Sequence, residues 1–254
     1  MKRTWMIAAA LVVVVALAAA GILLRPGDRG PVLTCGDYAL DNTTLAYYYW
    51  SEYFYFAEAY GDYLEGTVDF SQPLKKQPYD DTMSWEDYLL EETLNTVRDT
   101  MVMVFAAEEA GFVLPAEYDT ALQQVLLNFS VAAQEAGYQS LEAYLRASYG
   151  KGAETDSFET YLYQSHLAAA YADHLLEQCL PTDQEARDYF SQRQSEYVEF
   201  YDADPADEST WLEQARADLQ QETYQNTFLT IRSQYTFLVN ADNAVLKPPS
   251  GLYT

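Results

Sequence analysis

Histidine is the side chain most often used to bind a metal ion or move a proton near neutral pH, and this chain has two histidines. His166 and His174 stand eight residues apart in one predicted helix, which is about two turns. Two histidines that hold one metal ion on a helix are four residues apart. The two cysteines, Cys35 and Cys179, are also too few to complete a zinc module. We therefore expect ordinary surface or half-buried histidines and no metal site.

Three acidic residues, Asp202, Asp204 and Glu213, match positions 1, 3 and 12 of a calcium-binding loop. Such a loop needs glycine at position 6, where this chain has Asp207. An acidic segment before a helix N-terminus is favoured by the helix dipole, and we interpret residues 202–208 in that way. The chain also lacks a Gly-x-Ser-x-Gly motif and a glycine loop for phosphates. We predict no catalytic residues, no metal and no cofactor.

Aromatic residues are concentrated in one predicted helix, which begins after Asp41 and covers residues 42–60. A helix that is apolar on every side is either enclosed by the protein or offers adhesive surface. Because aromatic side chains dominate cores, we expect about half to two-thirds of these rings to be buried. The rest would line a concave surface that contacts unfolded chains, and we predict peptide-binding roles for Tyr47, Trp50, Phe54 and Tyr55. The ten rings are Tyr47, Tyr48, Tyr49, Trp50, Tyr53, Phe54, Tyr55, Phe56, Tyr60 and Tyr63.

The hydrophobic pattern predicts a mainly α fold with two or three short strands. Residues 31–40, around Gly36, are typical of a short strand or a strand and turn. Apolar residues at three- and four-residue steps, together with caps and terminal glycines, predict the helices. The predicted helices cover residues 42–60, 84–111, 115–137, 140–150, 155–180, 182–190 and 209–234. Residues 64–83 and 202–208 are predicted loops, residues 197–201 an extended stretch and residues 235–239 a strand.

The first thirty residues predict a membrane or export signal. Lys2 and Arg3 precede an uncharged apolar run at residues 5–24. Twenty residues span a bilayer core of about 30 Å, whereas a cleaved signal usually has an apolar region of about 7–15 residues. The length favours an uncleaved, single-pass signal anchor in the cell membrane, with cleavage near Ala20 and secretion as the alternative. The cations before the run place the rest of the chain outside the cytoplasm.

The remainder of the chain is strongly acidic. Residues 31–254 hold 10 Lys and Arg against 38 Asp and Glu, a net charge of −28. Binding to nucleic acid depends on Lys and Arg neutralising phosphates, so this charge excludes nucleic acid as a partner. Export would permit a disulfide between Cys35 and Cys179, although both could equally be small buried side chains.

The order of several short motifs resembles the N-terminal chaperone domain of SurA/PrsA-type foldases. The motifs are a short strand with glycine, an aromatic helix, two helix ends at residues 109–112 and 135–138 with the sequences Glu-Ala-Gly-Phe and Glu-Ala-Gly-Tyr, the segment 149–153, and the helix that starts at Thr182. The closing helix and strand at residues 209–239 extend the similarity over residues 32–239. The resemblance implies an extracytoplasmic, mostly helical, peptide-binding domain related to the chaperone part of trigger factor.

The chain departs from that family in one respect. The foldases insert a parvulin prolyl-isomerase domain of about a hundred residues after the position of Tyr197, and this domain uses paired histidines. Here eleven residues, 198–208, precede the final helix, and no histidine follows His174. The sequence therefore predicts that the isomerase domain is absent and that the protein is not an enzyme.

These observations give an expected organisation and function. We expect a signal anchor and linker at residues 1–30, a helical chaperone-like domain at residues 31–240 and an irregular tail at residues 241–254. We also expect residues 31–40 and 209–239 to belong to one folded unit, because lone strands leave unpaired edges. The predicted function is a membrane-anchored, non-catalytic chaperone for unfolded or newly exported polypeptides. The alternatives are an envelope protein interaction module and a degenerate peptidyl-prolyl isomerase.

Overall fold

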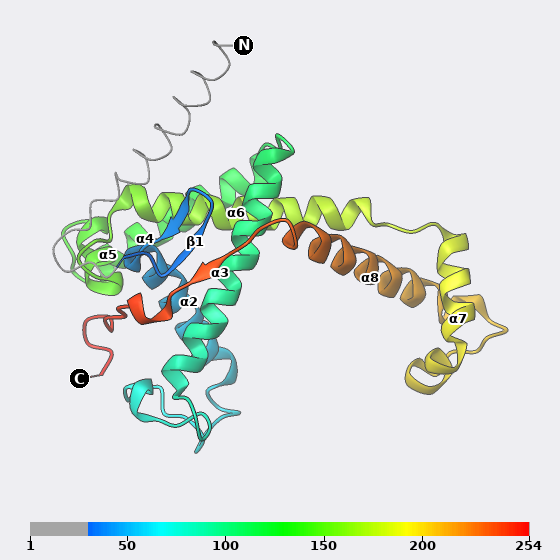
Figure 1. The fold of residues 1–254 in the computed structure, drawn as a ribbon, viewed down its shortest axis with the longest axis horizontal. Coiled ribbons are helices and arrows are strands. Elements are labelled where there is room, and N and C mark those ends of the chain that lie inside the picture. The colour runs from blue at the N-terminus through cyan, green and yellow to red at the C-terminus, as the bar shows by residue number, and fades with distance from the viewer. Residues whose placement is uncertain (1–29, 254) are drawn as a thin grey trace, which may run out of the picture. The chain divides into compact units, whose positions relative to one another are not determined.

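The computed structural model describes residues 30–253. Over these residues the chain is mainly helical, with a small three-stranded sheet, as the sequence predicts (Figure 1). The apolar run at residues 5–24 lies outside the described residues. Within residues 30–253, no helix has the length and apolar character needed to cross a membrane.

The described chain divides into two compact units. The first, which we call the sheet unit, contains the chain up to Leu90, then Arg146–Ala153, then the segment from Thr236. The second, the helical unit, contains Glu91–Leu145 and Glu154–Tyr235. Because the chain passes between the units four times, neither unit is a continuous piece of sequence.

The sheet joins the two ends of the described chain. Strand β1 (Leu33–Cys35) pairs with β2 (Tyr38–Leu40) in an antiparallel hairpin, where Gly36 has φ +55°. Strand β3 (Leu238–Val239) pairs antiparallel with the other edge of β1, which gives the order β2-β1-β3. The closing strand thus pairs with the N-terminal strand, and the two strands lie side by side in Figure 1. The expectation that residues 31–40 and 209–239 form one unit is met only from Thr236 onward, because the chain up to Tyr235 belongs to the helical unit.

Helix α2 (Asn42–Tyr60) follows the hairpin directly. The Asp41 side chain caps it by accepting a hydrogen bond from the Thr44 backbone N–H at 2.7 Å. The segment between α2 and α3 (Trp85–Glu109) is a loop with one short 3-10 turn, η1 (Leu74–Lys76), as predicted. A core cluster joins this loop to both helices, and the C-terminal tail packs on it through Leu246 and Leu252. Its buried members are Ala46, Tyr49, Trp50, Tyr53, Val68, Leu74, Trp85 and Leu89.

The C-terminal tail is tied to the start of α2, although apart from η3 (Ala241–Asn243) it has no regular structure. The Asn42 side chain accepts a hydrogen bond from the Val245 backbone N–H at 2.6 Å and donates one to the Asn243 carbonyl at 3.2 Å. The Asn243 side chain donates to the Pro31 carbonyl at 3.0 Å. The tail is thus irregular, as expected, but it is part of the sheet unit.

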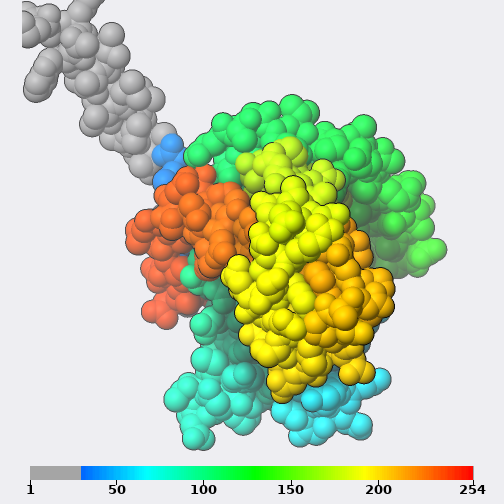
Figure 2. Space-filling model, turned by 90° about the vertical axis from the view of Figure 1, so that its right-hand side faces the viewer, coloured from blue at the N-terminus to red at the C-terminus, as the bar shows by residue number. Residues whose placement is uncertain are grey.

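The helical unit contains most of α3, together with α4 (Ala116–Glu135), α6 (Thr155–Gln178), α7 (Asp183–Tyr201) and α8 (Leu212–Arg232). Helix α5 (Leu141–Tyr149) begins in this unit and ends in the sheet unit. Helices α4 and α6 pack through Phe129 and Phe158, whose ring centroids are 4.8 Å apart. Helices α7 and α8 pack against each other and form the yellow and orange surface of Figure 2.

Two expectations for the second half of the chain are wrong. Residues 197–201 are not extended, because α7 continues to Tyr201 through one non-helical residue, Arg193. The buried Tyr197 packs on Phe190 and donates a hydrogen bond to Asp218 at 2.6 Å, and these contacts favour the helix over the strand propensity of its aromatic residues. We also expected α8 beside the N-terminal elements, but its main contacts are with α7 and α6.

The two cysteines are free thiols in this structure. The possible disulfide that the sequence left open is therefore not formed. Partial burial raises the pKa of the Cys35 thiol, which reduces its fraction of thiolate at neutral pH.

Candidate functional site

The structure divides the aromatic residues of α2 into a buried group and an exposed group. Tyr47 and Trp50 are 0% and 3% exposed and lie in the core. Tyr47 packs edge-on against Tyr149 at 5.0 Å, and Trp50 packs edge-on against Tyr49 at 4.9 Å. In this conformation these two predicted peptide-binding residues therefore have almost no exposed surface for a peptide to contact.

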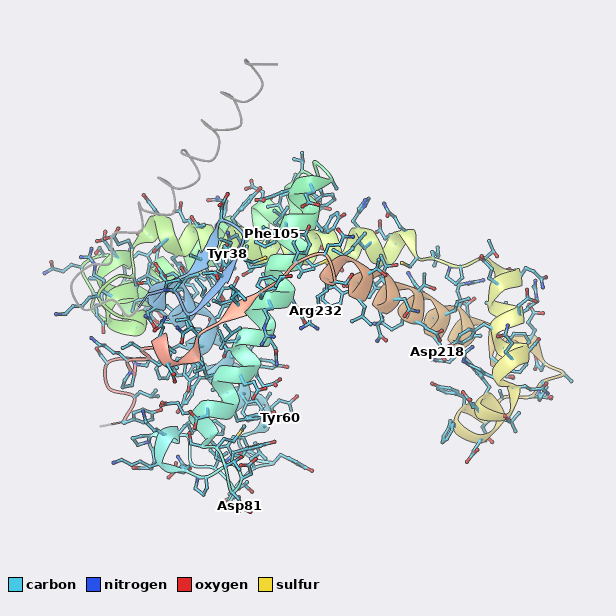
Figure 3. All side chains as sticks on the ribbon, viewed as in Figure 1. Tyr38, Tyr60, Asp81, Phe105, Asp218 and Arg232 are labelled. Carbon is cyan, nitrogen blue, oxygen red and sulfur yellow. The ribbon has the colours of Figure 1, made fainter. Side chains whose placement is uncertain are left out.

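The other two predicted residues are exposed. Phe54 is 47% exposed and Tyr55 is 62% exposed, near the C-terminal end of α2. Three more exposed rings, which the sequence reasoning did not select, lie at the end of α2 and in the following loop. We call these five exposed side chains, in the last two turns of α2 and the loop before α3, the aromatic surface: Phe54, Tyr55, Tyr60, Tyr63 and Tyr79. Figure 3 labels Tyr60, the last residue of α2, and Asp81, in the loop before α3.

Buried and half-buried rings contact part of the aromatic surface. Phe56 contacts Tyr60, with ring centroids 5.0 Å apart. Tyr79 stacks on Tyr88 at 4.2 Å and meets Trp85 edge-on at 4.8 Å. Rings held in this way lose little conformational entropy when another molecule covers them, which favours binding.

Hydrogen bonds within the loop hold Tyr79 in position. The Asp80 carboxylate accepts hydrogen bonds from the backbone N–H groups of Thr82 and Met83 at 2.6 and 2.9 Å. These bonds, led by the one from Thr82, hold the pKa of Asp80 below its usual range. The carboxylate therefore stays charged and keeps the turn closed at neutral pH.

The aromatic surface lies in an acidic segment. Between residues 41 and 74 the chain has six acidic residues and no lysine or arginine. Exposed acids in this segment include Glu58, Asp62 and Glu65. The surface thus combines apolar rings with negative charge, which keeps an adhesive patch soluble and disfavours acidic partners.

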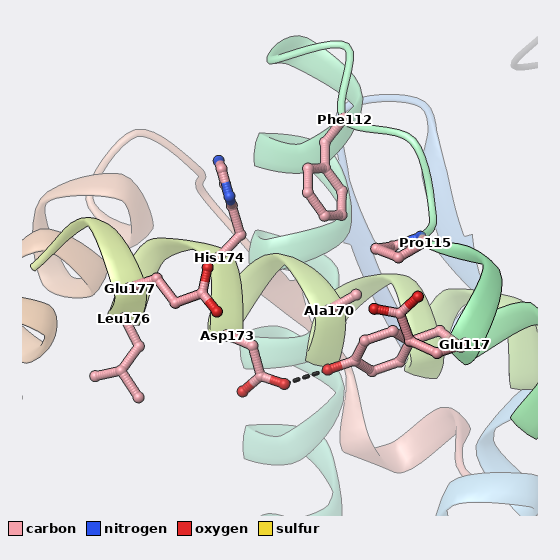
Figure 4. A pocket seen from close by; sticks show the side chains of 9 residues that line it. Phe112, Pro115, Glu117, Ala170, Asp173, His174, Leu176 and Glu177 are labelled. Atoms are coloured by element: carbon pink, nitrogen blue, oxygen red, sulfur yellow. Dashed lines mark hydrogen bonds between the residues drawn. The ribbon is translucent and has the colours of Figure 1, made fainter.

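The helical unit contains a pocket with a volume of about 370 Å³. It lies between α6 and the connection from α3 to α4 (Figure 4). Asp173 and His174 lie three and four residues after Ala170, and Glu177 lies four and three residues after them, so these side chains share one face of α6. The opposite wall of the pocket follows a turn at Gly111, which has φ +63°. It is lined by Phe112, Pro115, Glu117 and Tyr118.

Aromatic rings and carboxylates line this pocket together. The Phe112 ring contacts the Tyr171 and His174 rings, with centroids 5.3 and 5.2 Å away. The Tyr118 hydroxyl donates a hydrogen bond to the Asp173 carboxylate, drawn as a dashed line in Figure 4, and this bond raises the pKa of Tyr118. His174 also makes a hydrogen bond with the Gln178 side chain at 2.8 Å.

The other side chains considered for metal binding have local structural partners. His166 bonds the Leu162 carbonyl one turn earlier, at 2.8 Å. Asp204 accepts from the Ala206 backbone N–H at 2.9 Å, and Asp207 from the Ser209 N–H at 3.1 Å. Across residues 30–253, no three His, Cys, Asp or Glu side chains are grouped closely enough to hold a metal ion.

Comparison with known proteins gives no match. No family model fits the chain, and no curated protein or solved structure is significantly similar to it. The resemblance to SurA/PrsA-type foldases therefore remains a hypothesis that is based on motif order.

Proposed function

We propose that this protein is a non-catalytic chaperone that binds unfolded or newly exported polypeptides through the aromatic surface of its sheet unit. The observation that carries the proposal is the exposure of five aromatic side chains in the last two turns of α2 and the loop that follows: Phe54, Tyr55, Tyr60, Tyr63 and Tyr79. Large exposed apolar side chains in one region mark interaction surfaces in soluble proteins. Tyrosine hydroxyls also remain free to bond peptide groups of many sequences.

The foldase resemblance supports the same function and also suggests where in the cell the protein acts. In this proposal the run at residues 5–24 anchors the chain in the cell membrane, with the acidic units outside the cytoplasm. Bound segments are released and rebound, and the net charge of −28 keeps each complex soluble. No prolyl isomerisation is part of the mechanism, because the segment at residues 198–208 is too short for an isomerase domain.

Aggregation suppression tests the proposal. The purified chain in detergent is mixed with several unrelated unfolded proteins, and light scattering is followed. Phe54→Ser combined with Tyr55→Ser removes two rings that expose 47% and 62% of their surface. If a client covers about 100 Å² of each ring, the loss is at most about 2.5 kcal/mol per ring. We expect the double variant to require about ten times more protein for the same effect, which corresponds to about 1.4 kcal/mol and lies within this limit.

A matched control removes exposed apolar surface elsewhere. Leu127→Ser combined with Val131→Ser changes two exposed residues of α4, which are 56% and 44% exposed. We expect this variant to behave as the unchanged chain. Equal loss in both double variants would show non-specific adhesion and refute the aromatic surface as the site. Binding of one partner and no others would favour the interaction module, and peptide isomerisation above the uncatalysed rate would favour the isomerase.

A further inference from the structure

We propose that the pocket between α6 and the α3–α4 connection binds an organic cation: a guanidinium or primary ammonium group carried on an apolar stem. All of its lining residues belong to the helical unit, so the proposal stands apart from the aromatic surface. A volume of about 370 Å³ falls within the range of pockets that hold small ligands or single side chains.

The walls of the pocket favour a cation with apolar atoms attached. Phe112 and Tyr118 supply aromatic rings, and aromatic faces attract guanidinium and ammonium groups. Ring contacts with Tyr171 and His174 hold Phe112 in place. Pro115 and Ala170 provide apolar surface for a methylene stem.

The acidic residues that line the pocket favour a positively charged ligand. Glu117, Asp173 and Glu177 line it, and no lysine or arginine does. Within residues 30–253, none of the three carboxylates forms an ion pair, whereas Asp99, Asp183 and Glu208 each pair with an arginine.

Helix geometry makes the unpaired charges unfavourable. Asp173 and Glu177 are four residues apart on α6, and like charges at this spacing repel each other. The Tyr118 hydroxyl contacts Asp173 but brings no charge. A bound guanidinium group would neutralise this repulsion, and it can make paired hydrogen bonds to a carboxylate. The pocket thus carries negative charge that no lysine or arginine among its lining residues balances.

Two sources could supply this chemistry, an arginine or lysine side chain of a polypeptide and a free amine. Ligand-observed NMR with the full chain in detergent distinguishes them. The probes are the peptide acetyl-Gly-Gly-Arg-Gly-Gly-amide, the same peptide with neutral citrulline in place of arginine, and spermidine. We expect the arginine peptide to bind at least about tenfold more tightly than the citrulline peptide, and less tightly at high salt. Tighter binding of spermidine than of the peptide would identify a free amine as the ligand.

Single variants assign the binding to the pocket. Glu177→Gln and Phe112→Leu should each weaken the arginine peptide by about two- to fivefold. Glu199→Gln, an exposed acid of α7 outside the pocket, should have no effect. The melting temperature of Glu177→Gln should not fall, because the change removes a repulsion, so weaker binding would not reflect unfolding.

Equal affinity for the arginine and citrulline peptides, no binding of either cation, or normal binding by both pocket variants would each overturn the proposal. The Phe54→Ser, Tyr55→Ser double variant must retain peptide binding. If it does not, the cation binds at the aromatic surface, and the assignment to the pocket fails while the proposed function stands.

Discussion

Substitution of Gly152 by alanine tests how closely residues 146–153 pack on the first turn of α2. A Cβ atom at position 152 would lie 2.2 Å from the Thr43 Oγ1 atom and 3.4 Å from its Cβ atom. The φ angle of Gly152 lies outside the left-handed region, so the backbone itself accepts alanine. The substitution therefore creates one local clash, with a side chain that can relieve it only by changing its rotamer or moving the helix.

Two opposing effects determine how much Gly152→Ala changes the free energy of unfolding. Overpacking of this kind costs about 1–3 kcal/mol. Replacing glycine by alanine at a compatible backbone position stabilises a protein by about 0.4–1 kcal/mol, through the unfolded chain. Gly152→Ala should therefore destabilise the chain with Thr43 in place by up to about 2.6 kcal/mol. In a Thr43→Ala background the clash is absent, and the same substitution should become stabilising by about 0.4–1 kcal/mol.

The change of sign is measured by thermal and urea unfolding of four chains: the unchanged chain, the two single variants and the double variant. It is the effect of Gly152→Ala on stability that should change sign between the unchanged and the Thr43→Ala backgrounds. For a chain of this size, 1 kcal/mol corresponds to about 2–4 °C in melting temperature. Gly36→Ala is the control, because Gly36 has φ +55° and open space around it, so its cost of about 1–2 kcal/mol should not depend on residue 43. If Gly152→Ala has the same effect in both backgrounds, the close approach to Thr43 does not exist and the reasoning is refuted.

Two further predictions concern tyrosines. Tyr197→Phe should lower the free energy of unfolding by about 1.5–3 kcal/mol, because it removes a hydrogen bond to the Asp218 carboxylate. The control is Tyr201→Phe, at a residue that is 49% exposed, which should change the free energy of unfolding by less than about 0.5 kcal/mol. Urea unfolding measures both. The pKa values of Tyr38, Tyr49 and Tyr197 are raised above the usual value near 10, mainly because the side chains are buried. Just above about pH 10 these side chains therefore stay neutral in the folded chain but ionise in the unfolded chain. Their stabilisation should be complete below about pH 10 and fall above it, by about 1.4 kcal/mol per pH unit for each such tyrosine, and a urea midpoint that stays constant from pH 9 to pH 11 would contradict this.

Local signals in the sequence predicted most of the helix boundaries. Asp41 caps α2, and Thr182 and Glu185 form a capping box at the start of α7. The Thr182 backbone N–H donates to the Glu185 carboxylate at 2.8 Å, and the Glu185 backbone N–H donates to the Thr182 hydroxyl at 3.3 Å. Gly111 and Gly137 have positive φ angles of +63° and +80° where helices end. Such signals act within one turn, so they can be read from neighbouring residues.

The sequence-based predictions that were wrong or incomplete concern features that depend on contacts between residues far apart in the sequence. The conformation of residues 197–201 depends on Asp218, which lies on the next helix. The exposed and buried rings of α2 could not be separated by periodicity, because a helix that is apolar on all sides has no polar face to orient it. The pocket joins Phe112 to Asp173 and Glu177, and of its features the sequence shows only the i, i+4 pair of acids on α6.

The pairing of β1 with β3 sets the earliest time at which the sheet unit can be completed. Thr34 pairs with Leu238, and the hydrogen bond from Asn243 to Pro31 joins residues 212 positions apart. A ribosome adds about 5–20 residues per second, so about 10–40 s pass between synthesis of the first strand and synthesis of the third. During this interval β1 has one unpaired edge, and the aromatic core lacks the cover that Leu246 and Leu252 later provide. Until the C-terminal segment is synthesised, the N-terminal part of the chain therefore exposes apolar surface and a strand edge, which favours aggregation.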